Sequence, residues 1–170
     1  MTSVLLNRSE IAALIPHAGS MCLLEQVLSY SDAQIVCRTQ SHLSPSNPLK
    51  VEGQLSKMHL IEYGAQAIAI HGGLLEAAAE EAVQKESESK GCRPITRSPR
   101  ARRPNAGFIA TVKSVQWGRF EPCTEFLEIT AVAIATSEQS KVYEVTVCDA
   151  GLKRICSARV MIVHPEWEKD

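Results

Sequence analysis

The hydrophobic residues follow two periods along the chain, a helical period in one long segment and a two-residue period in several shorter ones. Between about residues 54 and 84, apolar residues recur at helical spacing, which predicts one long helix. Residues 58–75 are mostly apolar on every side of this helix, so we expect that part to be buried all round. The pair Gly72-Gly73 either weakens the helix or lets another backbone approach it closely.

Strand-like runs lie on both sides of the predicted helix. Two precede it, at residues 23–29 and 34–40, and four follow it, at 107–117, 125–136, 141–148 and 154–163. The connections between the later runs are short, which favours an antiparallel meander. A short helix at residues 9–15 comes first, with Ser9 as its expected cap and Pro16 after its end.

One long apolar helix with about six antiparallel strands predicts an α+β fold in which a sheet wraps around the helix. The length of 170 residues favours a single domain, residues 1–170. Such a unit leaves strand edges free, so we expect a dimer joined through a continuous sheet.

Composition and charge narrow the classes of function. The formal charge of −1 and the aromatic content of 5% argue against a nucleic-acid-binding protein. The longest charge-free stretch near the middle, between Glu62 and Glu76, is shorter than the ~20 residues of a membrane span. The cysteines and histidines have no metal-ligand spacing, so we expect no metal site. Reduced thiols and the lack of a secretory signal predict a cytoplasmic protein.

Residues 84–105 interrupt the hydrophobic pattern with a strongly basic segment. It carries seven Lys or Arg residues against two Glu, together with three prolines. We expect a flexible insert in the domain. The insert is either a solvated loop or an arm that docks an acidic carrier protein by charge attraction, which salt would weaken.

Glu62 is the most informative single residue, because it is the only charge between Lys57 and Glu76 in the most apolar helix. Burying a carboxylate is costly unless the group is paired, hydrogen-bonded or protonated. Gln66 lies one helical turn later on the same face. Two interpretations stay open: Glu62 touches water at the mouth of the helix, or it is an acid of raised pKa that faces a substrate tunnel.

Two segments of the chain resemble a known enzyme family. Residues 15–27 read IPHAGSMCLLEQV and resemble the PHRxPxLLxDRV opening of the FabZ-type 3-hydroxyacyl-acyl-carrier-protein dehydratases. Residues 60–66 read LIEYGAQ and resemble the central-helix motif LIEAxAQ of that family. Together with residues 47–49 and 61–72, the string is closer still to the ApeP-like dehydratases of aryl-polyene clusters. The resemblance covers most of the chain except the basic insert. It implies a hotdog fold, usually dimeric, that acts on acyl thioesters.

The resemblance implies that Glu62 is the catalytic acid, but it leaves the catalytic base open. The family carries its histidine in a GHFPGxPxxPG loop before the helix, and here residues 53–55 read GQL where GHF would fall. In that register Gln54 replaces the histidine. Alternatively, His42 and the following LSPSNP match HFPGNP with one inserted residue. The candidate bases are therefore His42 and then His17, and a partner chain could also supply the histidine.

The implied reaction is the dehydration of 3-hydroxyacyl thioesters on acyl carrier protein to 2-enoyl thioesters, in fatty-acid or aryl-polyene-type biosynthesis. A base takes the proton from C2 and an acid protonates the leaving 3-hydroxyl. A backbone N–H at the start of the central helix would polarise the thioester carbonyl. The reaction needs no cofactor beyond the phosphopantetheine that carries the substrate. The expected substrate-binding residues are Gln66, Gln54 and Leu55, and the expected partners are acyl carrier protein and either a second copy of the chain or a related dehydratase.

Two other functions remain open from the sequence. The chain could be a non-catalytic or half-catalytic subunit whose related partner supplies the histidine, because Gln54 stands in the place of that residue and the loop is short. It could also be a hotdog thioesterase in which Glu62 activates water, and its product would then be a free acid.

Overall fold

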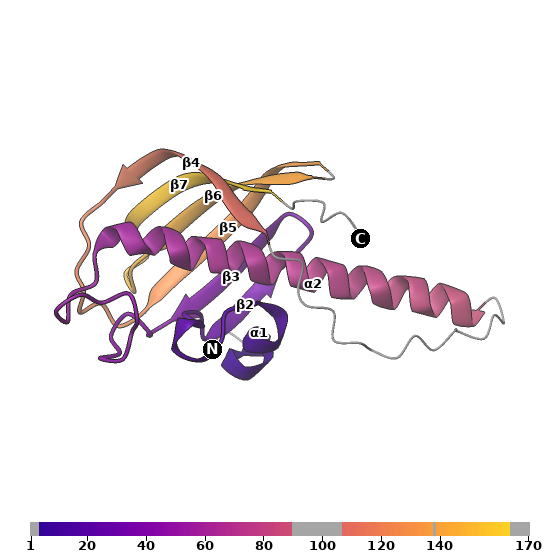
Figure 1. Ribbon diagram of the computed structural model, residues 1–170, viewed down its shortest axis with the longest axis horizontal. Helices are drawn as coiled ribbons and strands as arrows, with labels where there is room; N and C mark the ends of the chain where they lie inside the picture. Colours follow the sequence, from indigo (N-terminus) through magenta and orange to yellow (C-terminus); the bar gives the residue numbers. More distant parts are fainter. Residues whose placement is uncertain (1–3, 90–106, 138, 164–170) are drawn as a thin grey trace, which may run out of the picture.

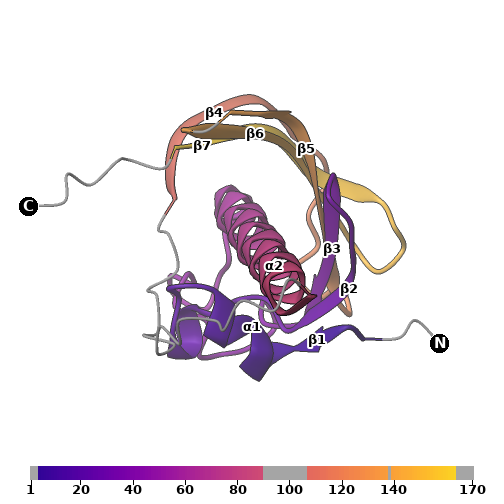
Figure 2. The same cartoon turned by 90° about the vertical axis from the view of Figure 1, so that its right-hand side faces the viewer.

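A curved antiparallel sheet wraps around one long helix in the computed structural model, which describes residues 4–89, 107–137 and 139–163 (Figures 1 and 2). The sheet has seven strands in the order β1-β2-β3-β5-β6-β7-β4. This arrangement confirms the predicted α+β fold. Residues 90–105 of the expected basic insert lie outside the described residues.

The bounds of the elements agree with the hydrophobic pattern over most of the chain. The helices are α1 (Arg8–Leu14) and α2 (Leu60–Ser89), with short 3-10 turns at Gly19–Met21 and Lys57–His59. The strands are β1 (Leu6–Asn7), β2 (Gln26–Tyr30), β3 (Gln34–Thr39), β4 (Phe108–Trp117), β5 (Leu127–Thr136), β6 (Ser140–Cys148) and β7 (Arg154–Val163). The sequence predicted about six strands, and the additional one, β1, has only two residues and so shows no period.

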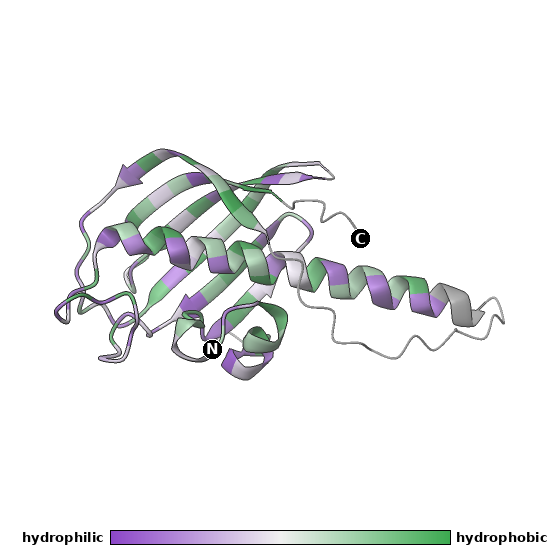
Figure 3. Ribbon diagram, in the orientation of Figure 1, coloured by the Kyte–Doolittle hydropathy of each residue, from purple (hydrophilic) through white to green (hydrophobic). Residues whose placement is uncertain are grey.

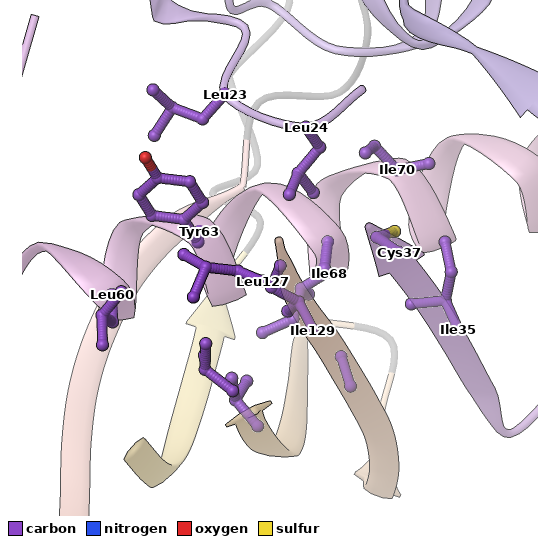
Figure 4. Close-up of a cluster of buried hydrophobic side chains, with 14 of the residues drawn as sticks. Leu23, Leu24, Ile35, Cys37, Leu60, Tyr63, Ile68, Ile70, Leu127 and Ile129 are labelled. Carbon is purple, nitrogen blue, oxygen red and sulfur yellow. The ribbon is translucent and has the colours of Figure 1, made fainter. Parts of the chain in front are cut away.

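Rows of buried side chains cross the sheet and form the wall that faces α2. In one row the register aligns Cys37 of β3 with Ile129 of β5, Val147 of β6 and Cys156 of β7. All four side chains are at most 1% exposed. Figure 4 shows part of this core, in which side chains from β3 and β5 lie beneath α2. The two-residue period seen in the sequence therefore separates the inner face of the sheet from its outer face.

One side of α2 packs closely against this wall. Its buried positions recur at helical spacing, and Leu60, Tyr63, Ala67 and Ile70 have no exposed surface. Gly64 lies so close to β6 that a Cβ atom there would collide with the side chain of Val145. In Figure 3 the part of α2 beneath the sheet is largely hydrophobic, whereas the end that extends past the sheet is mixed. The absence of a side chain at Gly64 thus lets the helix approach the sheet.

The expected burial of residues 58–75 on every side is wrong. Met58 is 61% exposed, and Ile61, Ala65 and Ala69 are only partly buried, because the sheet covers one side of α2 and leaves the other to a cavity. The helix also begins at Leu60 instead of near residue 54, and it continues to residue 89 through what was expected to be insert.

The first helix is capped by Asn7, so the expected cap at Ser9 is wrong. The Asn7 side chain accepts hydrogen bonds from the backbone N–H groups of Ser9 and Glu10, at 2.9 and 3.3 Å. Glu10 in turn accepts from the Asn7 backbone N–H at 2.7 Å, which completes a capping box. Buried Ile11 fixes this helix to the core, and the chain that leaves it carries His17.

Within the described ranges, no helix is long and apolar enough to cross a membrane.

Candidate active site

Glu62 and His17 form a close pair at the start of α2. Glu62 lies in the first turn of that helix, and His17 lies in the segment that follows α1. His17 Nε2 is 3.3 Å from Glu62 Oε1, and each side chain is 30% exposed. The structure therefore brings together, in one chain, the predicted acid and one of the two candidate bases.

Gln66 joins this pair to the loop that carries His17. Its Nε2 donates to Glu62 Oε1 at 3.1 Å and to the Met21 carbonyl at 2.8 Å. Its Oε1 accepts from the Leu23 backbone N–H at 2.9 Å. Because the Gln66 side chain has no exposed surface, these bonds are shielded from water. Gln66 thus fixes the loop at residues 21–23 and the Glu62 carboxylate relative to each other.

The loop between α1 and β2 is also held from its other side. Arg8 donates from Nη2 to the carbonyls of Gly19 and Cys22, at 3.3 and 3.1 Å. Gly19 has a φ of +60°, a left-handed conformation that suits glycine. Arg8 and Gln66 therefore fix the path of the chain on both sides of the 3-10 turn that follows His17.

The surroundings of Glu62 lower its pKa below the ordinary value of 4.5. Burial acts to raise this pKa, but the hydrogen bonds from His17 and Gln66 and the charge of His17 together outweigh it. The expectation of a raised pKa is thus wrong for the protein without substrate. Glu62 is ionised there and stays charged because it is paired.

The His17–Glu62 pair opens into a cavity of about 320 Å³ that follows α2. Its lining comes from the segment after α1, from α2, from the start of β4 and from β6 and β7. The lining residues are Leu14, Pro16, His17, Glu62, Ala65, Ile68, Ala69, Gly72, Gly73, Glu76, Gly107, Phe108, Ile109, Lys141 and Ile162. Most are apolar, and His17 and Glu62 supply the acid–base groups. The cavity can therefore hold an apolar chain beside a proton-transfer pair.

His42, the other candidate base, lies elsewhere. Its side chain is 1% exposed, and Nε2 donates to the Thr124 carbonyl at 2.8 Å. Burial lowers the pKa of His42, which keeps the ring neutral. Nδ1 is buried without a hydrogen-bond partner among the described residues. His42 is not part of the cavity lining, so its contacts fit a structural residue.

The expected substrate-binding residues Gln54 and Leu55 do not line the cavity either. Gln54 is exposed in a tight turn, where its backbone pairs with Val51, and Leu55 is 6% exposed within the core. The sequence missed the opposite wall, Phe108 and Ile109 of β4. No local pattern marks these two residues, because only the curvature of the folded sheet brings them beside α2.

The sequence of residues 9–85 matches the ApeP-like family, described as ApeP dehydratase. These residues make up fewer than half of the chain, and over them the sequence is similar to that family. The match confirms the resemblance stated from the sequence, and it includes His17, Glu62 and Gln66. A comparison with curated proteins gave no match.

Solved structures similar to this chain show its fold. A chain of the dehydratase heterocomplex ApeI:P from Xenorhabdus doucetiae has a TM-score of 0.67 and 20% identity, over 92% of this chain and 91% of that one. A hypothetical thioesterase from Streptococcus pneumoniae, solved with coenzyme A, has a TM-score of 0.52 and 12% identity, over 82% and 84%. The E. coli PaaI protein from the phenylacetic acid degradation operon has a TM-score of 0.50 and 13% identity, over 81% and 80%. The fold is thus the hotdog fold that the sequence resemblance implied.

Proposed function

We propose that this chain dehydrates 3-hydroxyacyl thioesters carried on acyl carrier protein, in fatty-acid or aryl-polyene-type biosynthesis. The observation that carries the proposal is the His17–Glu62 pair, which sits in the wall of an apolar cavity at 3.3 Å separation. Dehydration needs one group that accepts a proton and one that donates a proton, both beside the same substrate carbons. The family match at residues 9–85 supports the same reaction class.

The lowered pKa of Glu62 supports a definite division of roles. Glu62 enters the reaction as a carboxylate and takes the proton from C2, while His17 gives a proton to the 3-oxygen. The C2–H and C3–O bonds break, the C2–C3 double bond forms, and water leaves. Both hydrogen bonds described for Glu62 go to Oε1, so Oε2 is the oxygen that accepts the substrate proton.

The same pair also resets itself after each turnover. At the end of the reaction Glu62 is protonated on Oε2 and His17 is neutral. His17 Nε2 lies 3.3 Å from Oε1 of the same carboxyl group, so rotation of that group brings the proton back to His17. The first turn of α2 adds the positive end of the helix dipole close to the thioester carbonyl. No cofactor takes part in these steps, since phosphopantetheine only carries the substrate.

Product analysis tests this proposal directly. The full-length chain is incubated with a 3-hydroxyacyl thioester of acyl carrier protein, and mass spectrometry follows the loss of water. We expect the 2-enoyl thioester from the wild type and at least a roughly hundredfold slower reaction from Glu62→Gln. Glu81→Gln is the matched control, because Glu81 lies exposed on the same helix outside the cavity. Release of the free acid instead of the enoyl thioester would identify a thioesterase.

A second hotdog subunit is the partner that we propose besides the carrier protein. β4 is an edge strand of the sheet, and its Phe108 and Ile109 are 49% and 42% exposed while they also line the cavity. A subunit packed along β4 would therefore cover the outer wall of the site. The similar ApeI:P structure is a heterocomplex, which favours a related dehydratase as this subunit.

The proposed association with a related subunit provides a test of the half-catalytic alternative. If the partner supplies an essential histidine, the chain is inactive alone and becomes active when the related subunit is added, and His17→Gln has little effect in the mixture. If the His17–Glu62 pair performs the reaction, His17→Gln inactivates the mixture as well.

A further inference from the structure

The described part of α2 contains three glycines, and close packing explains two of them. A Cβ atom at Gly64 would collide with Val145, and one at Gly73 would lie 3.3 Å from the Leu14 carbonyl oxygen. Gly72 differs, because a Cβ atom there would meet no described atom within 4 Å. Its φ lies outside the left-handed region, so the backbone does not require glycine either.

The space beside Gly72 belongs to the cavity of the candidate active site. Gly72 is one of the lining residues, and it follows Glu62 by ten positions. Ten residues of helix correspond to about 15 Å along the axis. The lining also includes Phe108 and Ile109 of β4, Ile162 of β7 and the charged residues Glu76 and Lys141. Glycine is a poor helix former, so any ordinary side chain would favour the helix and fill this part of the cavity.

We propose that Gly72 is a specificity-determining residue that keeps the cavity open for the far end of an extended apolar acyl chain. This inference rests on the proposed function and adds the class of substrate. The reacting carbons lie at Glu62, and the chain runs along α2 and passes Gly72 about 15 Å away. Short acyl chains end before Gly72 and do not depend on it.

Two measurements on the full-length chain test the proposal. The first is binding of a series of saturated acyl-pantetheines of increasing length, which cannot be dehydrated. Wild-type affinity should rise with length up to chains that reach Gly72. In Gly72→Leu, the affinity for these long chains should fall roughly 10- to 200-fold, the range for methylene-sized changes in apolar pockets. The affinity for short chains should keep its wild-type value, and Gly72→Ala should give a smaller loss in the same direction.

Ala78→Leu is the matched control, since Ala78 is exposed on α2 outside the cavity and its variant should behave as wild type. Circular dichroism establishes that each variant is folded. The second measurement is turnover of 3-hydroxyacyl thioesters of the same lengths, in which Gly72→Leu should lose only the long ones.

The two proposals fail in different ways. If wild-type affinity does not depend on chain length, or if folded Gly72→Leu and Gly72→Ala keep the wild-type length profile, the role of Gly72 is refuted whatever the turnover. If the length profile shifts but no enoyl product forms from any substrate, either with the chain alone or with the related hotdog subunit added, the cavity assignment stands and dehydration is refuted.

Discussion

At the scale of single residues, the charge of Glu62 depends on neighbours that are distant in the sequence. His17 lies 45 positions earlier, and Gln66 reaches Glu62 while it holds backbone groups of residues 21 and 23. Without these contacts, partial burial would raise the pKa of Glu62. With them, the pKa is lowered and the side chain is a paired carboxylate. The role of base that we propose for Glu62 follows from this balance.

The roles of His17 and His42 are distinguished by exchanging each histidine for glutamine. His17→Gln should lower turnover roughly 10²- to 10⁴-fold and leave the protein folded, because His17 takes part in proton transfer. His42→Gln should instead destabilise the fold by about 1–3 kcal/mol, because it disturbs a buried hydrogen bond to Thr124. Turnover per folded molecule and urea unfolding are measured for both variants. Equal loss of turnover in folded His42→Gln would contradict this assignment.

The lowered pKa of Glu62 also predicts a pH dependence of stability. A carboxyl group whose pKa is lower in the folded state than in the unfolded state stabilises the fold at pH values above the unfolded pKa of about 4.5. This stabilisation is lost as the pH falls through the folded pKa. The difference in unfolding free energy between wild type and Glu62→Gln should therefore shrink as the pH is lowered from about 5.5 to about 3.5. Urea unfolding across this range measures it, and Glu81→Gln serves as the exposed control. A difference that stays constant with pH would show that the pKa of Glu62 is not lowered.

At the scale of the elements, Gln66 connects α2 with the loop between α1 and β2. Gln66→Met should leave the Leu23 N–H and the Met21 carbonyl unsatisfied and cost about 1–3 kcal/mol of stability. It should also raise the pKa of Glu62, since one of the hydrogen bonds that lower it is lost. We expect a lower kcat and a shift of the acidic limb of the pH–rate profile to higher pH. Gln84→Met, exposed on the same helix, should change neither stability nor this limb.

The sequence predicted well the elements in which the hydrophobic period continues over many residues. The errors lie at the starts of helices, where capping hydrogen bonds decide the boundary. The runs at residues 107–117 and 154–163 agree with β4 and β7 to within one residue. The start of α2 was placed too early because residues 54–59 are compatible with a helical period, yet Ser56 caps a 3-10 turn there through Met58. Asn7 was missed as a cap because Ser9 is an equally suitable residue type.

The candidate site was predictable only as far as it lies on one element. Glu62 and Gln66 are one helical turn apart, so their shared face followed from the spacing. The choice between His17 and His42 did not, because it depends on how the loops pack after folding. The wall at Phe108 and Ile109 depends on β4 pairing with β7, a contact between residues far apart in the sequence.

At the scale of the whole molecule, the edge strand β4 forms one side of the cavity. Among the residues that the structure describes, β4 pairs with β7 alone, and in Figure 2 it forms the end of the sheet that curves around α2. Its exposed apolar residues lie on an edge to which no described strand is paired, a combination that favours association with another strand. Because β4 both lines the cavity and is the proposed interface, the proposed catalysis depends on the proposed assembly.

This coupling predicts different effects for two isoleucines of similar exposure. Ile109 on β4 is 42% exposed, and Ile134 on β5 is 45% exposed, but β5 lies between β3 and β6 in the strand order, away from the β4 edge. Ile109→Glu should weaken association by about 2 kcal/mol or more, because it places a charge at the edge that a partner covers. Ile134→Glu should leave association unchanged. Sedimentation of the chain, alone and with a related hotdog subunit, measures both effects, and equal behaviour of the two variants would show that β4 is not the interface.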